Sequence, residues 1–193
     1  RPGICLRLYS ENDYVKRPIE TEPEIFRTNL ADVILRVLSM GYTSVNSFPF
    51  PENPSRRLIR DGLNILWEIG AVDEKQRITP AGHQIRKFPI DPRLARVLLE
   101  ASDRGCLKEI LIIVSALSIN DPRERSRTFR EYADREHRKY NDNRSDLLWF
   151  LRAWHRVCGI CKLTPSKMRR VARKEFLSDS RIKEWVLMEE HLR

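Results

Sequence analysis

The 193-residue sequence has only seven glycines, and they never form a phosphate-binding loop. Neither GxxxxGKS/T nor GxGxxG occurs, so the sequence lacks the backbone cradle that nucleotide-binding enzymes wrap around a phosphate. The HExxH motif of zinc proteases and the GxSxG motif of serine hydrolases are missing too. We therefore expect neither a catalytic residue nor a cofactor-binding site in this chain.

Long apolar runs and a cysteine framework are also missing. No stretch of about 18 apolar residues and no signal-peptide pattern occurs, which argues against a membrane span or export. Four cysteines do not suggest a disulfide framework, so we expect a reducing, cytoplasmic location. His155, Cys158 and Cys161 have the spacing of three metal ligands. Because no fourth ligand is placed to complete a zinc site, we favour ordinary buried cysteines and no metal.

Positive charge, by contrast, is abundant. The sequence has 36 Lys and Arg against 27 Asp and Glu, a net charge of +9, which favours an anionic partner such as nucleic acid. From Lys162 to Lys174 there are six basic residues and no acid. On a helix, four of them share one face that could follow a phosphate backbone or simply face solvent: Lys167, Arg170, Arg173 and Lys174.

The chain is organised around residues 106–127, CLKEILIIVSALSINDPRERSR. Apolar residues recur there at helical spacing and fill the other side as well, which predicts a buried central helix. Its inner face is predicted to hold Leu107, Ile110, Leu111, Val114 and Leu117. Pro122 ends the helix, and the loop beyond it carries Arg123, Arg125 and Arg127. Ser118 and Asn120 could bind phosphate or ribose without reading base sequence, although a solvated charged loop is an equal alternative.

Residues 23–90 have the order of elements of a winged helix. A helix from Pro23 to about Gly41 is followed by a second from about Pro54 to Ile69, by two short strands within 71–79, and by a short helix. In DNA-binding examples the second helix enters the major groove, which would place Arg56, Arg57 and Arg60 near nucleic acid; a solvated first turn is the favoured alternative. Residues 4–9 predict a single strand at the end of a sheet.

From residue 91 onward every segment predicts helix, and short turns between helices indicate a bundle. Asp91 and Pro92 are expected at the start of the first of these helices and Gly105 at its end. The helix after Ser145 is expected to bury Leu147, Leu148, Leu151 and Trp154. The last helix is expected to bury Ile182, Trp185, Met188 and Leu192. The fold class predicted is therefore mainly α, a winged-helix domain with a small β-hairpin followed by a helical bundle.

These segments, in this order, resemble DEAH-box RNA helicases. PGICLRLYSENDY is similar to the end of their second motor domain, FPFPENPSRRLIRDGLNILWEIGAVD to their winged helix, and CLKEILIIVSALSINDPRER to their ratchet-like helical bundle. SDLLWFLRAW and FLSDSRIKEW are similar to the bacterial, HrpA-like branch. The chain begins without an initiator Met and stops inside a helical pattern, so we expect a piece of a longer protein.

The resemblance implies three regions: 1–22 as the tail end of the second RecA-like motor domain, 23–90 as the winged helix, and 91–193 as the ratchet-like bundle. It implies a parent that is an ATP-dependent RNA helicase, with ATP and Mg in motor domains absent from this chain. The partners implied are single-stranded RNA, those motor domains and a C-terminal domain of the same parent. The residues implied to touch the RNA backbone are Ser118, Asn120, Asp121, Arg123 and Arg125. The alternatives are a winged-helix regulator of duplex DNA and a protein-interaction scaffold.

Overall fold

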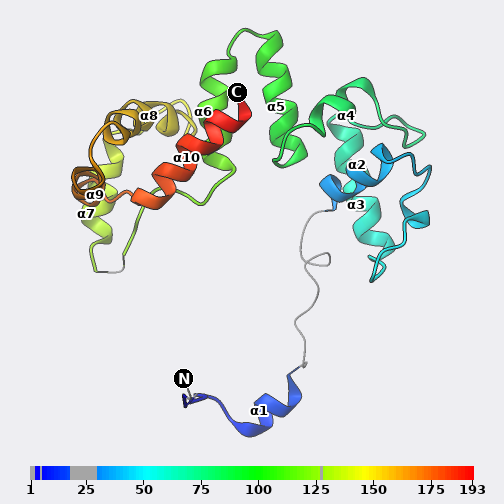
Figure 1. Cartoon of the computed structure of the whole chain (residues 1–193), viewed down its shortest axis with the longest axis horizontal. Coiled ribbons are helices and arrows are strands. Elements are labelled where there is room, and N and C mark those ends of the chain that lie inside the picture. Colours follow the sequence, from blue (N-terminus) through cyan, green and yellow to red (C-terminus); the bar gives the residue numbers. More distant parts are fainter. Residues whose placement is uncertain (1–2, 5, 18–29, 127) are drawn as a thin grey trace.

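The computed structural model describes residues 3–4, 6–17, 30–126 and 128–193 (Figure 1). These residues are mostly helical, and the β-pairing found among them consists of isolated bridges. The first helix, α1 (Glu11–Lys16), is capped by Ser10 and buries no residue. The strand predicted at 4–9 is wrong where it can be seen, since residues 4 and 6–9 form none. The start of the helix predicted from Pro23 lies outside the described residues.

The first packed unit contains α2 (Ala31–Ser39), the short 3-10 helix η2 (Val45–Ser47), α3 (Arg56–Glu68) and α4 (Pro80–Ile85). The hydroxyl of Ser55 begins α3 by accepting a hydrogen bond from the Leu58 N–H at 3.3 Å. Apolar residues at helical spacing on α2 and α3 then meet in one core. Its fully buried members include Ile34, Leu35, Leu66 and Ile85.

The small β-hairpin predicted within 71–79 is wrong in its strands, because only one bridge forms, between Val72 and Ile78. The Asp73 carboxylate closes the turn by accepting the backbone N–H groups of Lys75 at 2.9 Å and Arg77 at 2.8 Å. The ladder does not extend outward from this turn, because the Ala71 N–H donates to the Leu66 carbonyl at 2.7 Å and Pro80 begins α4.

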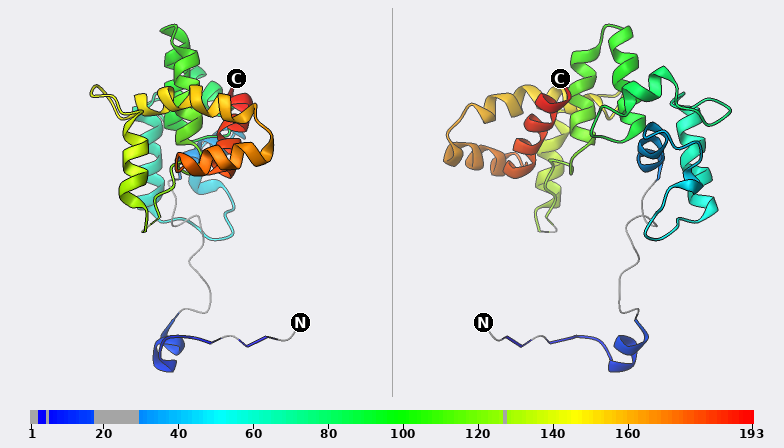
Figure 2. Two further views of the ribbon diagram at one scale, coloured as in Figure 1. Left: turned by 90° about the vertical axis from the view of Figure 1, so that its left-hand side faces the viewer. Right: turned by 45° about the vertical axis from the view of Figure 1, so that its right-hand side comes forward.

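The second unit is a bundle of α5 (Pro92–Asp103), α6 (Leu107–Leu117), α7 (Arg130–Arg138), α8 (Leu148–Cys161), α9 (Pro165–Lys174) and α10 (Asp179–Leu192). As predicted, Asp91 caps α5 by accepting the Arg93 N–H at 2.8 Å. Gly105, with φ of 70°, turns the chain into α6. Figures 1 and 2 show α5 and α6 side by side. Because α6 contacts α5, α8 and α10, it is the central helix of the bundle.

The buried faces of the bundle helices differ in part from the prediction. On α6, Leu107 and Leu117, at the two ends of the helix, are 37% and 43% exposed. Leu147, the residue before α8, is exposed, whereas Trp149 and Phe150 of α8 are buried. The last helix is as predicted, with Ile182, Trp185 and Leu192 buried and Met188 partly buried.

Trp185 fixes how α10 lies on α6. Its ring is completely buried, and its Nε1–H donates to the carbonyl of Ile112 at 3.0 Å and to Oγ of Ser115 at 3.1 Å. A buried indole that finds partners for its only donor both fills the core and sets the register of the two helices. The loop after α6 therefore starts from a fixed position.

Candidate nucleic-acid interface

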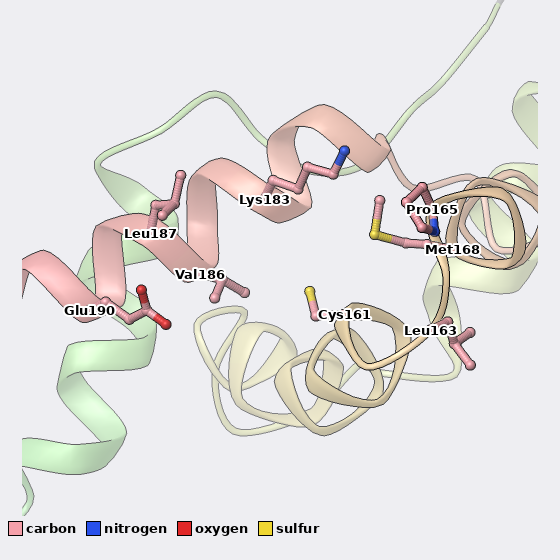
Figure 3. Close-up of a pocket in the computed structure, with 8 residues that line it drawn as sticks. All are labelled: Cys161, Leu163, Pro165, Met168, Lys183, Val186, Leu187 and Glu190. Atoms are coloured by element: carbon pink, nitrogen blue, oxygen red, sulfur yellow. The ribbon is translucent and has the colours of Figure 1, made fainter.

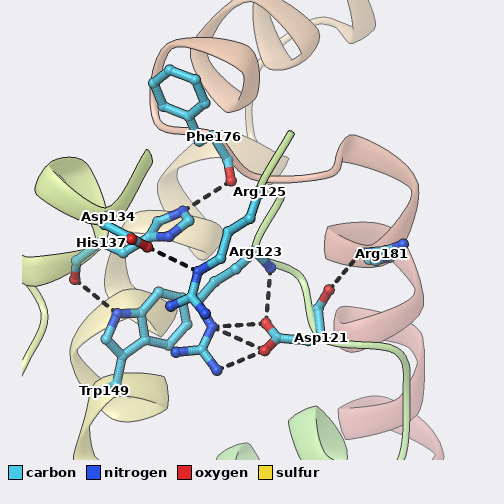
Figure 4. A network of polar contacts seen from close by, with 8 residues as sticks. All are labelled: Asp121, Arg123, Arg125, Asp134, His137, Trp149, Phe176 and Arg181. Atoms are coloured by element: carbon cyan, nitrogen blue, oxygen red, sulfur yellow. Dashed lines mark hydrogen bonds and ion pairs between the residues drawn. The ribbon is translucent and has the colours of Figure 1, made fainter. Parts of the chain in front are cut away.

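The loop that follows α6 is tied to the turn between α9 and α10. The Glu124 N–H donates to the carbonyl of Phe176 at 2.8 Å, and the Ser178 N–H donates to the carbonyl of Pro122 at 2.9 Å. Arg123 and Leu177 form an antiparallel bridge between these two bonds. Backbone pairing of this kind holds a loop in one conformation. The arginines of the loop are therefore displayed from a fixed backbone (Figure 4).

Arg123 is held by an acid and by an aromatic ring. Its Nε lies 2.9 and 3.0 Å from the two carboxylate oxygens of Asp121, and its Nη2 lies 2.6 Å from one of them. The guanidinium also lies over the ring of Trp149, 4.8 Å from the centroid, so that only 26% of the side chain is exposed. The carbonyl of Asp121 in turn accepts from Arg181 at 2.8 Å. Arg123 thus has a structural role in addition to its charge.

This contact favours the ionised form of Asp121. Burial alone raises the pKa of its carboxyl, but the hydrogen bonds and charge of Arg123 outweigh burial and leave the pKa below its usual value. The carboxylate therefore compensates part of the charge of Arg123 at neutral pH.

Arg125 points toward α7, where its Nε lies 3.0 Å from Oδ1 of Asp134. Between the loop and α7 there is a polar pocket of about 220 Å³. It is lined by Arg123, Arg125, Asp134, His137, Arg138 and Asn141. Three of these six residues are arginines and one is an acid, so the pocket is positively charged.

Ser118 and Asn120 lie at a different pocket, of about 610 Å³, which faces Glu184 and His191 of α10. The Ser118 hydroxyl donates to the carbonyl of Val114 at 2.8 Å, which leaves its oxygen free to accept. The structure therefore divides the predicted loop residues between two pockets. Arg127 lies outside the described residues.

The helix α9 presents the predicted basic face. Its Met168 and Ala172 are buried, while the four cations on the other side are exposed: Lys167, Arg170, Arg173 and Lys174. Within the described part of the chain no ion pair involves any of these four, whereas the neighbouring Arg169 lies 3.4 Å from Asp179. The helix α9 leads directly into the turn to which the arginine loop is tied, and α9 and this loop are together called the basic segment below.

On α3 of the first packed unit, Arg56, Arg57 and Arg60 are exposed. Arg57 lies 3.8 Å from the carboxylate of Asp61, a distance typical of a loose surface ion pair. The face of α3 that carries Gly62 packs against α2 instead.

An apolar pocket of about 370 Å³ lies between α10 and the turn from α8 to α9 (Figure 3). Cys161 lines it, and burial raises the pKa of this thiol and of the Cys158 thiol.

No group of three or more His, Cys, Asp or Glu residues that could hold a metal occurs in the described residues. None of the described helices has the length and apolar character needed to span a membrane.

Two side chains of this interface were missed by the sequence reasoning. His137 is 3% exposed, and its Nε2 lies 2.9 Å from the carbonyl of Phe176, the same carbonyl that accepts the Glu124 N–H of the loop. Trp149 donates its Nε1–H to the carbonyl of His137 at 2.9 Å. Both contacts join segments that no local spacing relates, so only the folded chain reveals them.

Residues 62–90 match the family model described as helicase associated domain (HA2), winged-helix, and residues 91–150 match helicase associated domain (HA2), ratchet-like. The chain is 46% identical over 189 residues to the ATP-dependent RNA helicase HrpA of Escherichia coli, covering 95% of this chain and 14% of that protein. The HrpA homolog of Haemophilus influenzae is 44% identical over 191 residues, covering 95% of this chain and 15% of that protein.

A human relative, the probable ATP-dependent RNA helicase DHX35, is 36% identical over 157 residues, covering 78% of this chain and 22% of that protein. The chain thus spans only 14–15% of the length of the two bacterial relatives.

Proposed function

Because the chain belongs to the helicase-associated (HA2) winged-helix and ratchet-like domains of DEAH-box RNA helicases, we propose that it grips single-stranded RNA by the sugar–phosphate backbone. In this proposal the parent protein is an ATP-dependent RNA helicase whose motor domains bind ATP and Mg²⁺ and act in the cytoplasm. This chain supplies no catalytic residue; it couples its grip on RNA to those motor domains.

The basic segment carries the proposal. Four cations of α9 have no acid paired with them among the described residues, and α9 ends at the turn to which the arginine loop is tied. Cations held at fixed positions along a surface attract a polyanion and release its counterions, without any need to read bases. A motor that moves along RNA requires an accessory domain that binds the RNA without sequence preference.

The test is a titration of labelled oligouridine and of duplex DNA with the whole chain at low and at moderate salt, followed by fluorescence anisotropy. We expect weak binding of the RNA that falls steeply with salt and depends little on sequence. RNA affinity that is equal at both salt concentrations would contradict the proposal.

Tight, sequence-dependent binding of duplex DNA would instead favour a winged-helix regulator. In that case the triple substitution Arg56→Ala, Arg57→Ala and Arg60→Ala should abolish duplex binding, because those side chains are exposed on α3. The same triple variant is the matched control for RNA, since it removes three positive charges outside the basic segment. We also expect the purified chain to hydrolyse no ATP.

A further inference from the structure

The outer side of α10 carries apolar side chains that the described part of the chain leaves exposed. The inner side of this helix already fills the core with Ile182 and Trp185, while Val186 is only partly buried and Leu187 is 54% exposed. A helix that is apolar on two sides is normally covered on both. Because contiguous exposed apolar surface marks an interaction site, the outer side of α10 is a candidate docking face.

This face borders the apolar pocket of about 370 Å³ between α10 and the turn from α8 to α9 (Figure 3). From that turn the pocket is lined by Leu163, Pro165 and Met168, and Leu163 is itself exposed. Leu187 also lines the pocket that holds Ser118, so it borders a hollow on each side. An apolar side chain of a partner would find room beside Leu187 in either hollow.

Two opposite charges frame the exposed leucine. Lys183 and Glu190 line the same pocket, with Leu187 between them along α10 (Figure 3). They are seven residues apart, close to two helical turns or about 10 Å along the axis, so they share one face. Both side chains are exposed, and in the described residues the ion pairs of α10 involve Asp179 and Glu189 instead. The charges of Lys183 and Glu190 are therefore available to a partner.

The order of these residues makes the face complementary to itself. In an antiparallel pair of α10 helices related by a two-fold axis, Lys183 of each copy lies opposite Glu190 of the other copy, and Val186 lies opposite Leu187. A two-fold interface requires this kind of self-complementary surface. A partner of a different kind would need no such symmetry, so the pattern favours a second copy of this chain.

We propose that two copies of this chain associate through the outer face of α10, with the two helices antiparallel. The apolar contact around Leu187 supplies most of the affinity. The two Lys183–Glu190 pairs set the direction of the helices, since exposed ion pairs contribute little free energy. Because the contact is limited to one helix face and the pocket beside it, and each copy carries a net charge of +9, the dimer is weak.

The experiment is sedimentation equilibrium of the whole chain in about 0.15 M salt, where charges more than about 8 Å apart are largely screened. We expect a monomer–dimer equilibrium as the concentration rises from about 10 μM to about 1 mM. A chain that is still monomeric at about 1 mM would overturn the proposal.

The variants Lys183→Glu and Glu190→Lys test the pairing of charges. Each should weaken the dimer by about tenfold, because two-fold symmetry replaces two attractive pairs with two repulsive ones. The first variant lowers the net positive charge of the chain and the second raises it, so a non-specific charge effect would change the two dissociation constants in opposite directions. The double variant restores both the pairs and the net charge, and its dissociation constant should lie within about twofold of the wild-type value. Weakening in only one single variant, or no recovery in the double variant, would contradict the antiparallel pairing.

Leu187→Gln tests the apolar centre of the face. Its side chain is exposed, so the substitution should not unfold the chain, and the dimer should weaken by about tenfold or more. Val97→Gln is the matched control, since Val97 is an exposed apolar residue of α5, and it should leave the dissociation constant unchanged. A dimer that responds equally to both substitutions uses another surface, and the proposal is then wrong.

Dimer formation and the grip on RNA are tested separately. Lys183, Leu187 and Glu190 lie on α10, outside the basic segment. A monomeric chain that binds oligouridine would overturn the dimer and leave the proposed function standing. A dimer that does not bind oligouridine would do the reverse.

Discussion

Replacing Arg123 with alanine should destabilise the bundle by more than an ordinary surface arginine would. The guanidinium lies 4.8 Å from the centre of the Trp149 ring, and only 26% of the side chain is exposed. A partly desolvated cation–π contact contributes about 1 kcal/mol, and an ion pair of this exposure contributes less than about 1 kcal/mol after screening by solvent. We therefore expect Arg123→Ala to lower the free energy of unfolding by about 1–2 kcal/mol.

The assay is urea unfolding of the chain, followed by tryptophan fluorescence. Arg125→Ala is the matched control, because Arg125 lies two residues away in the same loop but pairs with Asp134 at a more exposed position; it should cost less than about 0.5 kcal/mol. Combining Arg123→Ala with Asp121→Asn in a double-mutant cycle separates the ion pair from the aromatic contact. Equal losses for Arg123→Ala and Arg125→Ala would refute the reasoning.

The same contact predicts an effect of pH. Arg123 leaves the pKa of Asp121 below its usual value even though burial alone raises it. A carboxyl whose pKa is lower in the folded state contributes stability above its unfolded pKa of about 3.9 and loses it as the pH falls through the folded value. Wild-type stability should therefore fall below about pH 4, and Arg123→Ala should lose less over that range.

Three further substitutions test the fold. Trp185→Phe should cost about 1–3 kcal/mol in urea unfolding, because it removes the donor to Ile112 and leaves part of a fully buried site empty. Gly82→Ala should destabilise the winged-helix unit, since a Cβ there would lie 2.1 Å from the Ala71 carbonyl oxygen. Gly159 lies inside α8 with no atom within 4 Å of an added Cβ, so Gly159→Ala should raise the free energy of unfolding by about 0.5–1 kcal/mol. A lower stability of Gly159→Ala, or an unchanged stability of Gly82→Ala, would contradict this account.

The features that the sequence predicted well are those determined by neighbouring residues. Asp91 begins α5 and Gly105 ends the turn after it, because a side-chain cap and a positive φ depend on local chemistry. The central position of α6 followed from its apolar character on all sides. Its exposed ends could not be foreseen, since the exposure of Leu117 depends on how the other helices pack around α6.

In the candidate site, too, local features could be predicted from the sequence and long-range contacts could not. Charge and turn residues indicated the arginine loop and the basic face of α9. They could not show that Arg123 lies on Trp149, or that His137 contacts Phe176 across 39 residues of sequence. Contacts of that range are set by the packing of whole helices. The division of the predicted loop residues between two pockets likewise has no signal in the spacing of the residues.

The central claim, that cations of the basic segment hold an RNA backbone, is tested most directly by the salt dependence of RNA binding. Each phosphate contact on a single strand contributes about 0.7 to the slope of log K against log salt. Replacing the four α9 cations with glutamine should therefore lower the slope by up to about 3 units, whereas neutralising Arg56, Arg57 and Arg60 should leave it unchanged. A slope that stays the same in the α9 variant, or falls equally in both, would contradict the account.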